Sequence, residues 1–284
     1  MKRVAITGGR GRLAPGLALY LTGLGHQVQT FSRNAGDEHR ETAELTLPAV
    51  SGGFDAILHL GWSSVPLLSE QHPGIEDLED LPLAVALAAA ASSCPKPPNI
   101  VFFSTAAIYG NTGREPVGED HVCRPLGGYA AAKLKAEEVF LRVPRCTILR
   151  ITNIFGAGCL RTRPQGIIPV LTEACRSDNT FTLWGDGSAT KDYLAVEDLH
   201  RAVGVLLHAE ICGVFNVASG HTLSVNELIS LVSSAAGRPL RVRYTPHFPW
   251  DVEQSFVSSK RLQASTGWEP SIDPASAIMA MAQT

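Results

Sequence analysis

Tyr129 and Lys133 stand four residues apart in the segment YAAAK (129–133). This spacing puts two side chains on one face of a helix, one turn apart. The phenol of a free tyrosine has a pKa near ~10, which is too high for a base at neutral pH, and a nearby ammonium favours its ionised form. We therefore expect Tyr129 to act as an acid/base whose pKa is lowered by Lys133. The alternative is an ordinary helix with a surface tyrosine and lysine.

A hydroxyl pair precedes this helix. The apolar run at 100–103 predicts a strand, and Ser104 and Thr105 follow it directly. Ligands of open α/β sheets bind at the carboxyl ends of the strands. Thr105 is thus expected to bind the oxygen whose proton Tyr129 handles. A hydroxyl, a phenol and an ammonium together suit hydride transfer at a carbinol carbon.

A glycine-rich turn near the start of the chain, TGGRGRLA (7–14), follows the first predicted strand and opens a helix. Gly8 permits a tight turn, Gly11 lets a pyrophosphate approach the backbone, and Ala14 is small enough for close helix packing. The helix N-terminus at Arg12 and Leu13 offers N–H groups and a positive dipole to phosphates. The motif predicts a dinucleotide site, and the alternative is a turn without a ligand.

The second strand indicates which dinucleotide is bound. NAD sites place Asp or Glu at its end, whereas here it ends in Ser32 and Arg33, with no carboxylate before Asp37. Arg33 and Arg10 would attract a 2′-phosphate. The pattern favours NADP, with NAD possible, and the alternative is that both arginines are solvated charges. Leu60, the last residue of the strand at 56–60, and Gly61 after it are also expected to line the cofactor.

The elements that must position these residues alternate along the chain. Strand-like runs at 4–6, 28–31, 56–60, 100–103 and 147–149 alternate with helical patterns at 13–24, 75–92 and 128–142. This alternation predicts an α/β fold of the Rossmann type, with a doubly wound parallel sheet. After residue 154 Pro and Gly interrupt the pattern, which resumes with a helix at 197–208 and a strand at 213–217. We expect a dinucleotide-binding domain at 1–153 and 193–218 and a discontinuous substrate lobe at 154–192 and 219–284.

Composition excludes several classes of protein. The 284 residues carry 24 Lys+Arg against 27 Asp+Glu, so no nucleic-acid surface is expected. No apolar run approaches the ~20 residues of a membrane span, and no signal peptide is recognised. The six cysteines are scattered without a CxxC pair, which predicts free thiols, no metal site and a cytoplasmic location.

The motifs together resemble the extended short-chain dehydrogenase/reductases, particularly the UDP-sugar 4-epimerase type of the NAD-dependent epimerase/dehydratase family. The resemblance rests on TGGRGRLA (7–14), DAILHL (55–60), FFSTAAIYG (102–110), YAAAK (129–133), LRITNIFG (149–156), WGDGSATKDY (184–193), VFNVASG (214–220) and TGWEP (266–270). It implies a Rossmann domain with a smaller C-terminal substrate lobe. It also implies Thr105 as hydroxyl partner, Tyr129 as acid/base beside the cofactor and Lys133 on the nicotinamide ribose. A homodimer formed by helices 75–92 and 128–142 is implied as well.

The resemblance further implies a nucleotide-sugar substrate, but some positions depart from the family. Asn153 matches the family's substrate-side Asn, while Lys191 replaces an Arg that grips the diphosphate. A second Arg is missing from the stretch HFP (247–249), and Asp80 stands where Asn is common. Arg161 and Arg163 are the compensating candidates for the phosphates, with a solvated loop as the alternative. Ser64 lies beyond the strand near where nicotinamide and sugar should meet.

Three functions compete for this sequence. The first is a C4 epimerase that oxidises a sugar carbinol, rotates the ketone and returns the hydride to its other face. The second is an NADPH-dependent 4-ketoreductase of a deoxysugar pathway, which Arg33 favours because an epimerase regenerates its cofactor. The third is a catalytically silent NADP-binding regulator, disfavoured because Thr105, Tyr129 and Lys133 are all present. Whole-chain resemblance places the epimerase first.

Overall fold

A parallel sheet of seven strands forms the larger part of the molecule. The computed structural model describes residues 1–34, 39–156, 166–177 and 179–283. The strand order is β10-β6-β5-β4-β1-β2-β3. These strands are β1 Arg3–Thr7, β2 Gln27–Ser32, β3 Arg40–Glu41, β4 Ala56–His59, β5 Asn99–Thr105, β6 Cys146–Ile151 and β10 Gly213–Val217. The predicted α/β class with a doubly wound parallel sheet is confirmed.

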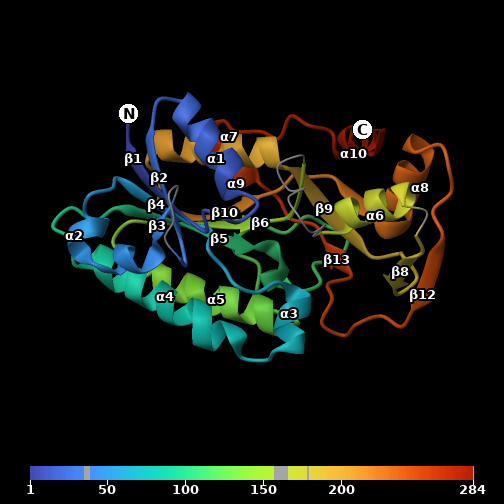
Figure 1. Ribbon diagram of the computed structural model, residues 1–284, viewed down its shortest axis with the longest axis horizontal. Helices are drawn as coiled ribbons and strands as arrows, with labels where there is room; N and C mark the ends of the chain where they lie inside the picture. Colours follow the sequence, from blue (N-terminus) through green and yellow to red (C-terminus); the bar gives the residue numbers. More distant parts are fainter. Residues whose placement is uncertain (35–38, 157–165, 178, 284) are drawn as a thin grey trace.

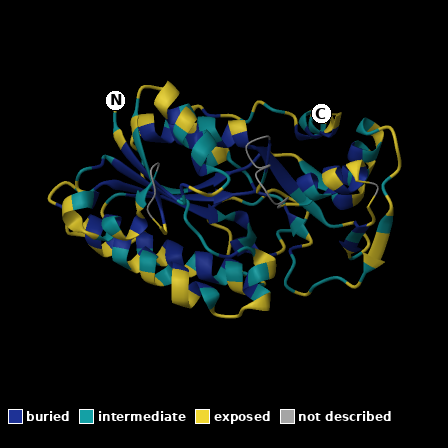
Figure 2. Cartoon of the chain, viewed as in Figure 1, coloured by how far each residue is buried: buried dark blue, intermediate teal, exposed yellow. Residues whose placement is uncertain are grey.

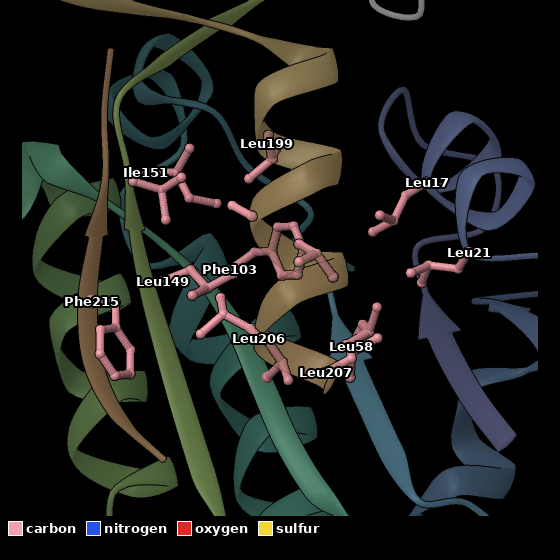
Figure 3. Packing of buried hydrophobic residues seen from close by; sticks show 14 of the residues in the cluster. Leu17, Leu21, Leu58, Phe103, Leu149, Ile151, Leu199, Leu206, Leu207 and Phe215 are labelled. Atoms are coloured by element: carbon pink, nitrogen blue, oxygen red, sulfur yellow. The ribbon is translucent and has the colours of Figure 1, made fainter. Parts of the chain in front are cut away.

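Helices cover both faces of this sheet (Figure 1). Helices α1 (Ala14–Gly23) and α7 (Val196–Ala209) lie on one face, and α4 (Ile75–Ser92) and α5 (Gly128–Phe140) on the other. The central strands are predominantly apolar because both of their faces are covered. Figure 3 shows one of the two resulting cores, in which Phe103 and Leu149 of the sheet pack against Leu206 of α7. Because helices cover both faces, we expect ligands to bind at the carboxyl edge of the sheet.

A second group of elements lies beyond this edge and is built on shorter sheets. Strand β9 (Thr190–Ala195) pairs with β7 (Asn153–Phe155), β11 (Thr222–Ser224) and β13 (Gln254–Ser255), while β8 (Phe181–Trp184) pairs with β12 (Val242–Thr245). Helices α6 (Ile167–Arg176), α8 (Val225–Ala235) and α10 (Pro274–Gln283) pack on them around a separate apolar cluster. Helix α9 (Lys260–Thr266) returns to the main sheet through Leu262. The division into two domains at the stated boundaries stays a prediction.

Several short elements were not expected from the sequence. They are β3 and the segments η1 (Thr42–Thr46), α2 (Pro48–Ser51), α3 (Pro66–Gln71) and η2 (Ala106–Tyr109). None is long enough to show a hydrophobic period, and tertiary contacts hold them. Burial follows the layers, with dark-blue strands inside and exposed outer helix faces (Figure 2). Among the described residues no helix is long and apolar enough to cross a membrane.

Candidate active site

Helix α5 begins where the carboxyl edge of the sheet meets the second group of elements. Its first turn has no side-chain cap; instead the Gly128 N–H donates to the Glu70 carboxylate over 3.1 Å. A Cβ on Gly128 would lie 2.7 Å from Ser69 Oγ, so this position must stay small. The fit against α3 sets where Tyr129, the next residue, enters the site.

Lys133 is buried one turn further along, with 3% of its surface exposed. Its Nζ donates to the Phe103 carbonyl over 2.8 Å and lies 4.0 Å from the centre of the Trp62 ring and 4.7 Å from that of Phe102. Burial lowers the pKa of Lys133 to about 7, although Asp80 and Glu137 oppose that shift. At neutral pH this lysine therefore exchanges between its charged and neutral forms.

Tyr129 does not have the lowered pKa that its spacing from Lys133 predicts. Burial, followed by the charges of Asp80 and Glu76, raises the pKa of the Tyr129 phenol to about 12. The expectation is corrected for a physical reason: the Lys133 ammonium points to the Phe103 carbonyl, 6.0 Å from the Tyr129 ring centre. In this state the site holds a protonated phenol, which is a proton donor.

Thr105 ends β5 and caps the short helix η2. Its hydroxyl oxygen accepts the Ala107 N–H over 3.2 Å, which leaves the hydroxyl hydrogen to be donated. In the strand register Thr105 lies opposite Ile151 of β6, and β5 is the strand whose Phe103 carbonyl holds Lys133. Tyr129, Lys133 and Thr105 thus belong to one corner of the sheet, as the sequence predicts, though their roles stay proposals.

The glycine loop closes tightly over the ends of β1 and β4. Gly8 has a φ of +74°, and a Cβ there would lie 3.0 Å from Gly61 Cα, so only glycine fits without strain. The Gly11 N–H donates to the Gly8 carbonyl over 2.7 Å, and a Cβ on Gly11 would meet that same oxygen at 2.9 Å. Helix α1 then starts at Ala14, and its N-cap residue Leu13 provides no side-chain hydrogen bond. These features fit a dinucleotide phosphate, because the first N–H groups of the helix have no side-chain acceptor.

Arg33 lies at the end of β2, where it forms an ion pair with Glu79 of α4 over 2.8 Å and donates to Ser63 Oγ. Its side chain remains 69% exposed. Ser32 is buried and donates its hydroxyl to the Asn34 carbonyl. Glu79 therefore competes with any phosphate for the one arginine that the sequence assigns to the 2′-position on this strand.

Asp80 and Glu76 are buried carboxyls one turn apart on α4, 4% and 3% exposed. Asp80 accepts the Ser63 N–H over 2.8 Å, and Glu76 accepts the Ser64 hydroxyl. Burial raises the pKa of Asp80. The two carboxyls fix Ser63 and Ser64 and with them the loop that carries Trp62. The Ser64 hydroxyl, predicted to contact the substrate, is instead hydrogen-bonded to Glu76 of α4.

The substrate-side residues meet where β7 and β9 pair. Asn153 is exposed, and its amide donates to the Asp192 carbonyl over 3.0 Å. Lys191, on the same strand as Asp192, forms an ion pair with Asp251 over 2.6 Å. The charge that would grip a diphosphate is therefore already compensated. Arg161 and Arg163 lie outside the described residues.

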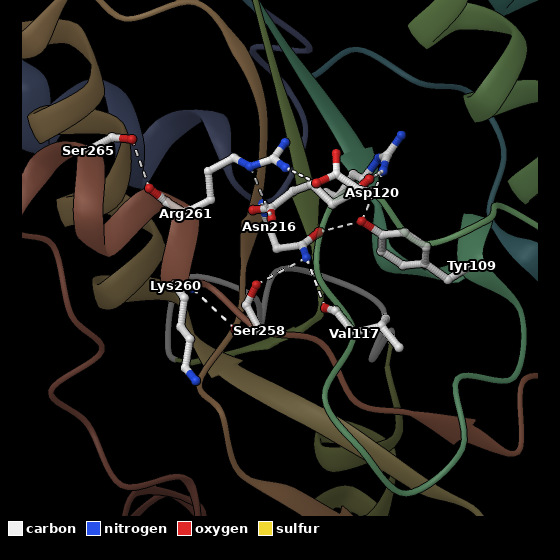
Figure 4. A network of polar contacts seen from close by, with 10 residues as sticks. Tyr109, Val117, Asp120, Asn216, Ser258, Lys260, Arg261 and Ser265 are labelled. Atoms are coloured by element: carbon white, nitrogen blue, oxygen red, sulfur yellow. Dashed lines mark hydrogen bonds and ion pairs between the residues drawn. The ribbon is translucent and has the colours of Figure 1, made fainter.

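A polar network connects the strands beside the site to the loop that precedes α5 (Figure 4). Arg150 of β6 donates to the Tyr109 hydroxyl over 2.9 Å, and that hydroxyl donates to Asn216 Oδ1 over 2.8 Å. The Asn216 N–H donates to Glu119, whose carboxylate also pairs with Arg261 of α9. The network joins β6, β10 and helix α9 to the loop before α5. It holds in place the segment from which the catalytic helix starts.

Sequence reasoning assigned no role to Arg150 and Glu137, and gave none to Glu76. A usable signal was present for Arg150, because a charged residue inside an apolar strand is buried only when paired. The described residues hold no group of His, Cys, Asp and Glu arranged for a metal ion.

Comparison with known proteins agrees with this geometry. The model of the NAD-dependent epimerase/dehydratase family matches residues 4–218, which is most of the chain. The chain belongs to this family. A UDP-glucose 4-epimerase of Corynebacterium glutamicum is 26% identical to it, over 94% of this chain and 91% of that protein. A UDP-glucose 4-epimerase of Azospirillum brasilense is 27% identical, over 95% and 88%.

Solved structures show the same fold. The UDP-glucose 4-epimerase of Thermus thermophilus, in complex with NAD, has a TM-score of 0.86 at 24% identity, covering 99% of this chain and 97% of that one. The UDP-glucuronic acid 4-epimerase of Bacillus cereus reaches 0.87 at 18% identity, covering 99% and 98%. These structures confirm the Rossmann-type fold. The family match and the relatives confirm an enzyme of the NAD-dependent epimerase/dehydratase type.

Proposed function

We propose that this enzyme epimerises C4 of a nucleotide sugar with a tightly held nicotinamide dinucleotide. The observation that supports the proposal is that Lys133, 6.0 Å from the Tyr129 ring centre, bonds the Phe103 carbonyl of β5, the strand that ends in Thr105. A bound nicotinamide dinucleotide supplies the hydride acceptor and donor. Gly8 and Gly11 would admit its pyrophosphate, because side chains there would collide with backbone.

The chain's own residues handle the proton. Thr105 donates its hydroxyl hydrogen to the substrate oxygen and orients it. Tyr129 takes the proton when the carbinol is oxidised and returns it when the ketone is reduced. A phenol with a pKa of about 12 favours the second step. The first step requires Tyr129 to be a phenolate, a form that a bound cofactor with positive charge would favour. In its charged form, Lys133 binds the nicotinamide ribose.

The protonated phenol also favours a second candidate, net ketone reduction by NADPH. A site that rests with its proton on Tyr129 is prepared to protonate a ketone rather than to deprotonate an alcohol. Arg33 supports NADP(H), with Arg10 as its partner, although the solved relative from Thermus thermophilus carries NAD. We therefore propose a preference for NADP(H) that the Arg33–Glu79 ion pair weakens.

NMR of a nucleotide-sugar panel, with and without NADPH, tests these alternatives. An epimerase interconverts C4 epimers without net oxidation of cofactor, whereas a reductase consumes NADPH in proportion to product. Tyr129→Phe is the control that must abolish either reaction. If purified protein binds NADPH and converts no sugar in the panel, both enzymatic proposals fail in favour of the silent regulator.

Asn153, Lys191, Arg161 and Arg163 are proposed to bind the substrate, with Ser64 acting only indirectly through its loop.

A homodimer is proposed across α4 and α5, where Leu78 and Val85 are exposed, 82% and 53%. Ala84, Ala88 and Ala91 of α4 pack inward in the core. Light scattering at micromolar concentration checks the dimer.

The described cysteines are free thiols, which supports a cytoplasmic location.

A further inference from the structure

Trp62 covers the ammonium of Lys133. The Nζ atom lies 4.0 Å from the indole centre, and Phe102 closes a second side at 4.7 Å. The indole is held in turn, because its ring packs at 5.8 Å from Phe102 and the loop beyond it is bonded to α4. Trp62 thus excludes water from the group that carries the positive charge of the site.

Asp80 acts on the same ammonium from α4. One of its oxygens accepts the Ser63 N–H, and the other has no hydrogen-bond partner among the described residues. A buried carboxylate with an unpaired oxygen attracts any cation nearby, and its charge favours the protonated form of Lys133. Asp80 thus holds Lys133 in the state that Trp62 disfavours.

We propose that Trp62 and Asp80 are positioning residues that set the charge of Lys133 in opposite directions. The indole attracts a cation through its ring face, but at 4.0 Å it also keeps water from the ammonium, and burial is the largest cause of the lowered pKa of Lys133. Removing the indole admits water and favours the ammonium. Removing the carboxylate charge leaves the buried ammonium less compensated and favours the neutral amine.

Other ionisable groups face the same space and enter the balance. They are Glu76 and Asp80 of α4, His59 of β4, and Tyr129 and Glu137 of α5, the helix of Lys133 itself. His59 stays neutral, because burial lowers its pKa to about 3. Glu137 is already occupied by Arg150 and Ser104. Asp80 is therefore the carboxylate whose removal changes the field at Lys133 without breaking an ion pair.

Carbon-13 NMR of the lysine ε-carbons in the full-length protein tests the proposal. The lysines of the chain are Lys2, Lys96, Lys133, Lys135, Lys191 and Lys260. The resonance lost in Lys133→Met identifies Lys133, which should titrate near pH 7. We expect Asp80→Asn to lower its pKa and Trp62→Ala to raise it, each by about one pH unit. Trp62→Phe keeps a ring over the ammonium and is expected to give a smaller rise.

Matched controls separate this effect from general damage. Asp77→Asn removes an exposed carboxylate from the same helix as Asp80, and Trp184→Ala removes an indole that packs at a tilt against Phe248. Neither should move the Lys133 titration. Two results overturn the proposal: a Lys133 pKa that is unchanged in Asp80→Asn and both Trp62 variants, or one that moves in the same direction in all of them.

The functional consequence rests on the catalytic role proposed for Lys133. The positioning of Lys133 and its catalytic role can be refuted independently of each other. If Lys133 must be charged to hold the ribose, activity falls as pH rises through its pKa. This limb of the pH–activity profile should then move to lower pH in Asp80→Asn and to higher pH in Trp62→Ala. Opposite NMR shifts with an unmoved activity limb would uphold the positioning residues and refute the assigned role of Lys133.

Discussion

Arg150 and Glu137 form a buried ion pair beneath the catalytic helix. Three hydrogen bonds of 2.8, 3.1 and 3.2 Å join the guanidinium of β6 to the carboxylate of α5. The two side chains are 8% and 1% exposed. The Glu137 carboxylate is the main reason that the pKa of Arg150 is raised further above its usual range. Because Glu137 lies one turn after Lys133, this pair sets the distance of α5 from the sheet.

Breaking that pair should destabilise the protein strongly. Glu137→Gln leaves the Arg150 charge buried without its counter-charge, at a cost of about 3–5 kcal/mol in the free energy of unfolding. Urea unfolding measures this cost. The exposed pair of Asp77 on α4 and Lys135 on α5 is the comparison, and Asp77→Asn should cost about 1 kcal/mol or less. Equal effects of the two substitutions would contradict the buried pair's importance.

Tyr129→Phe should reduce turnover by ~10² or more, because the ring remains and the acid/base group is lost. Binding of the dinucleotide, measured by fluorescence titration, should be nearly unchanged. Lys133→Met should reduce both turnover and cofactor binding. Thr105→Ala should give a turnover between those of the unmutated protein and Tyr129→Phe, because it removes one hydrogen bond but no proton carrier. Retention of more than about half of the activity in Tyr129→Phe would refute the mechanism.

Cofactor preference should respond to Arg33 and its ion-pair partner in opposite ways. Arg33→Asp should reverse a preference for NADP(H), since a carboxylate repels the 2′-phosphate. Glu79→Gln should increase the ratio of NADP(H) to NAD(H) affinity, because it releases the arginine from the 2.8 Å pair. Calorimetric titration with both cofactors gives the ratio. Tighter NAD(H) binding by the unmutated protein would disprove the NADP preference.

Freeing Lys191 should strengthen the grip on a diphosphate. Asp251→Asn removes the carboxylate that now lies 2.6 Å from the ammonium. The KM for a nucleotide sugar should fall by about two- to fivefold, the equivalent of ~1 kcal/mol or less, while kcat stays close to its original value. Lys191→Gln supplies the opposite variant and should raise KM. A KM that rises in Asp251→Asn would show that the ion pair itself shapes the site.

His59 should make the protein sensitive to acid. Its pKa is about 3 in the folded protein against 6.5 as the reference for the unfolded chain. The unfolded state therefore binds a proton first, so stability is complete above pH 6.5 and falls as the pH drops toward 3. At pH 5 the loss should be about 2 kcal/mol. Urea unfolding at pH 8 and pH 5 should show a smaller loss in His59→Gln, but not in a control, His72→Gln, at an exposed histidine.

Local patterns in the sequence determined the scaffold and the reacting groups. The apolar runs became β1, β4, β5 and β6, and the spacing of Tyr129 and Lys133 became one turn of α5, because these features depend only on neighbours along the chain. The glycines of the loop could be interpreted in the same way, since a tight turn demands residues without side chains.

Tertiary structure alone decided how those groups are charged. Trp62 reaches Lys133, Glu137 reaches Arg150, and Asp251 reaches Lys191, each between segments that only the folded chain brings together. A pKa depends on burial and on every charge within several ångströms, so the spacing of Tyr129 and Lys133 predicted the wrong direction for the phenol. The sequence determined which groups are present, and packing determined where their protons rest.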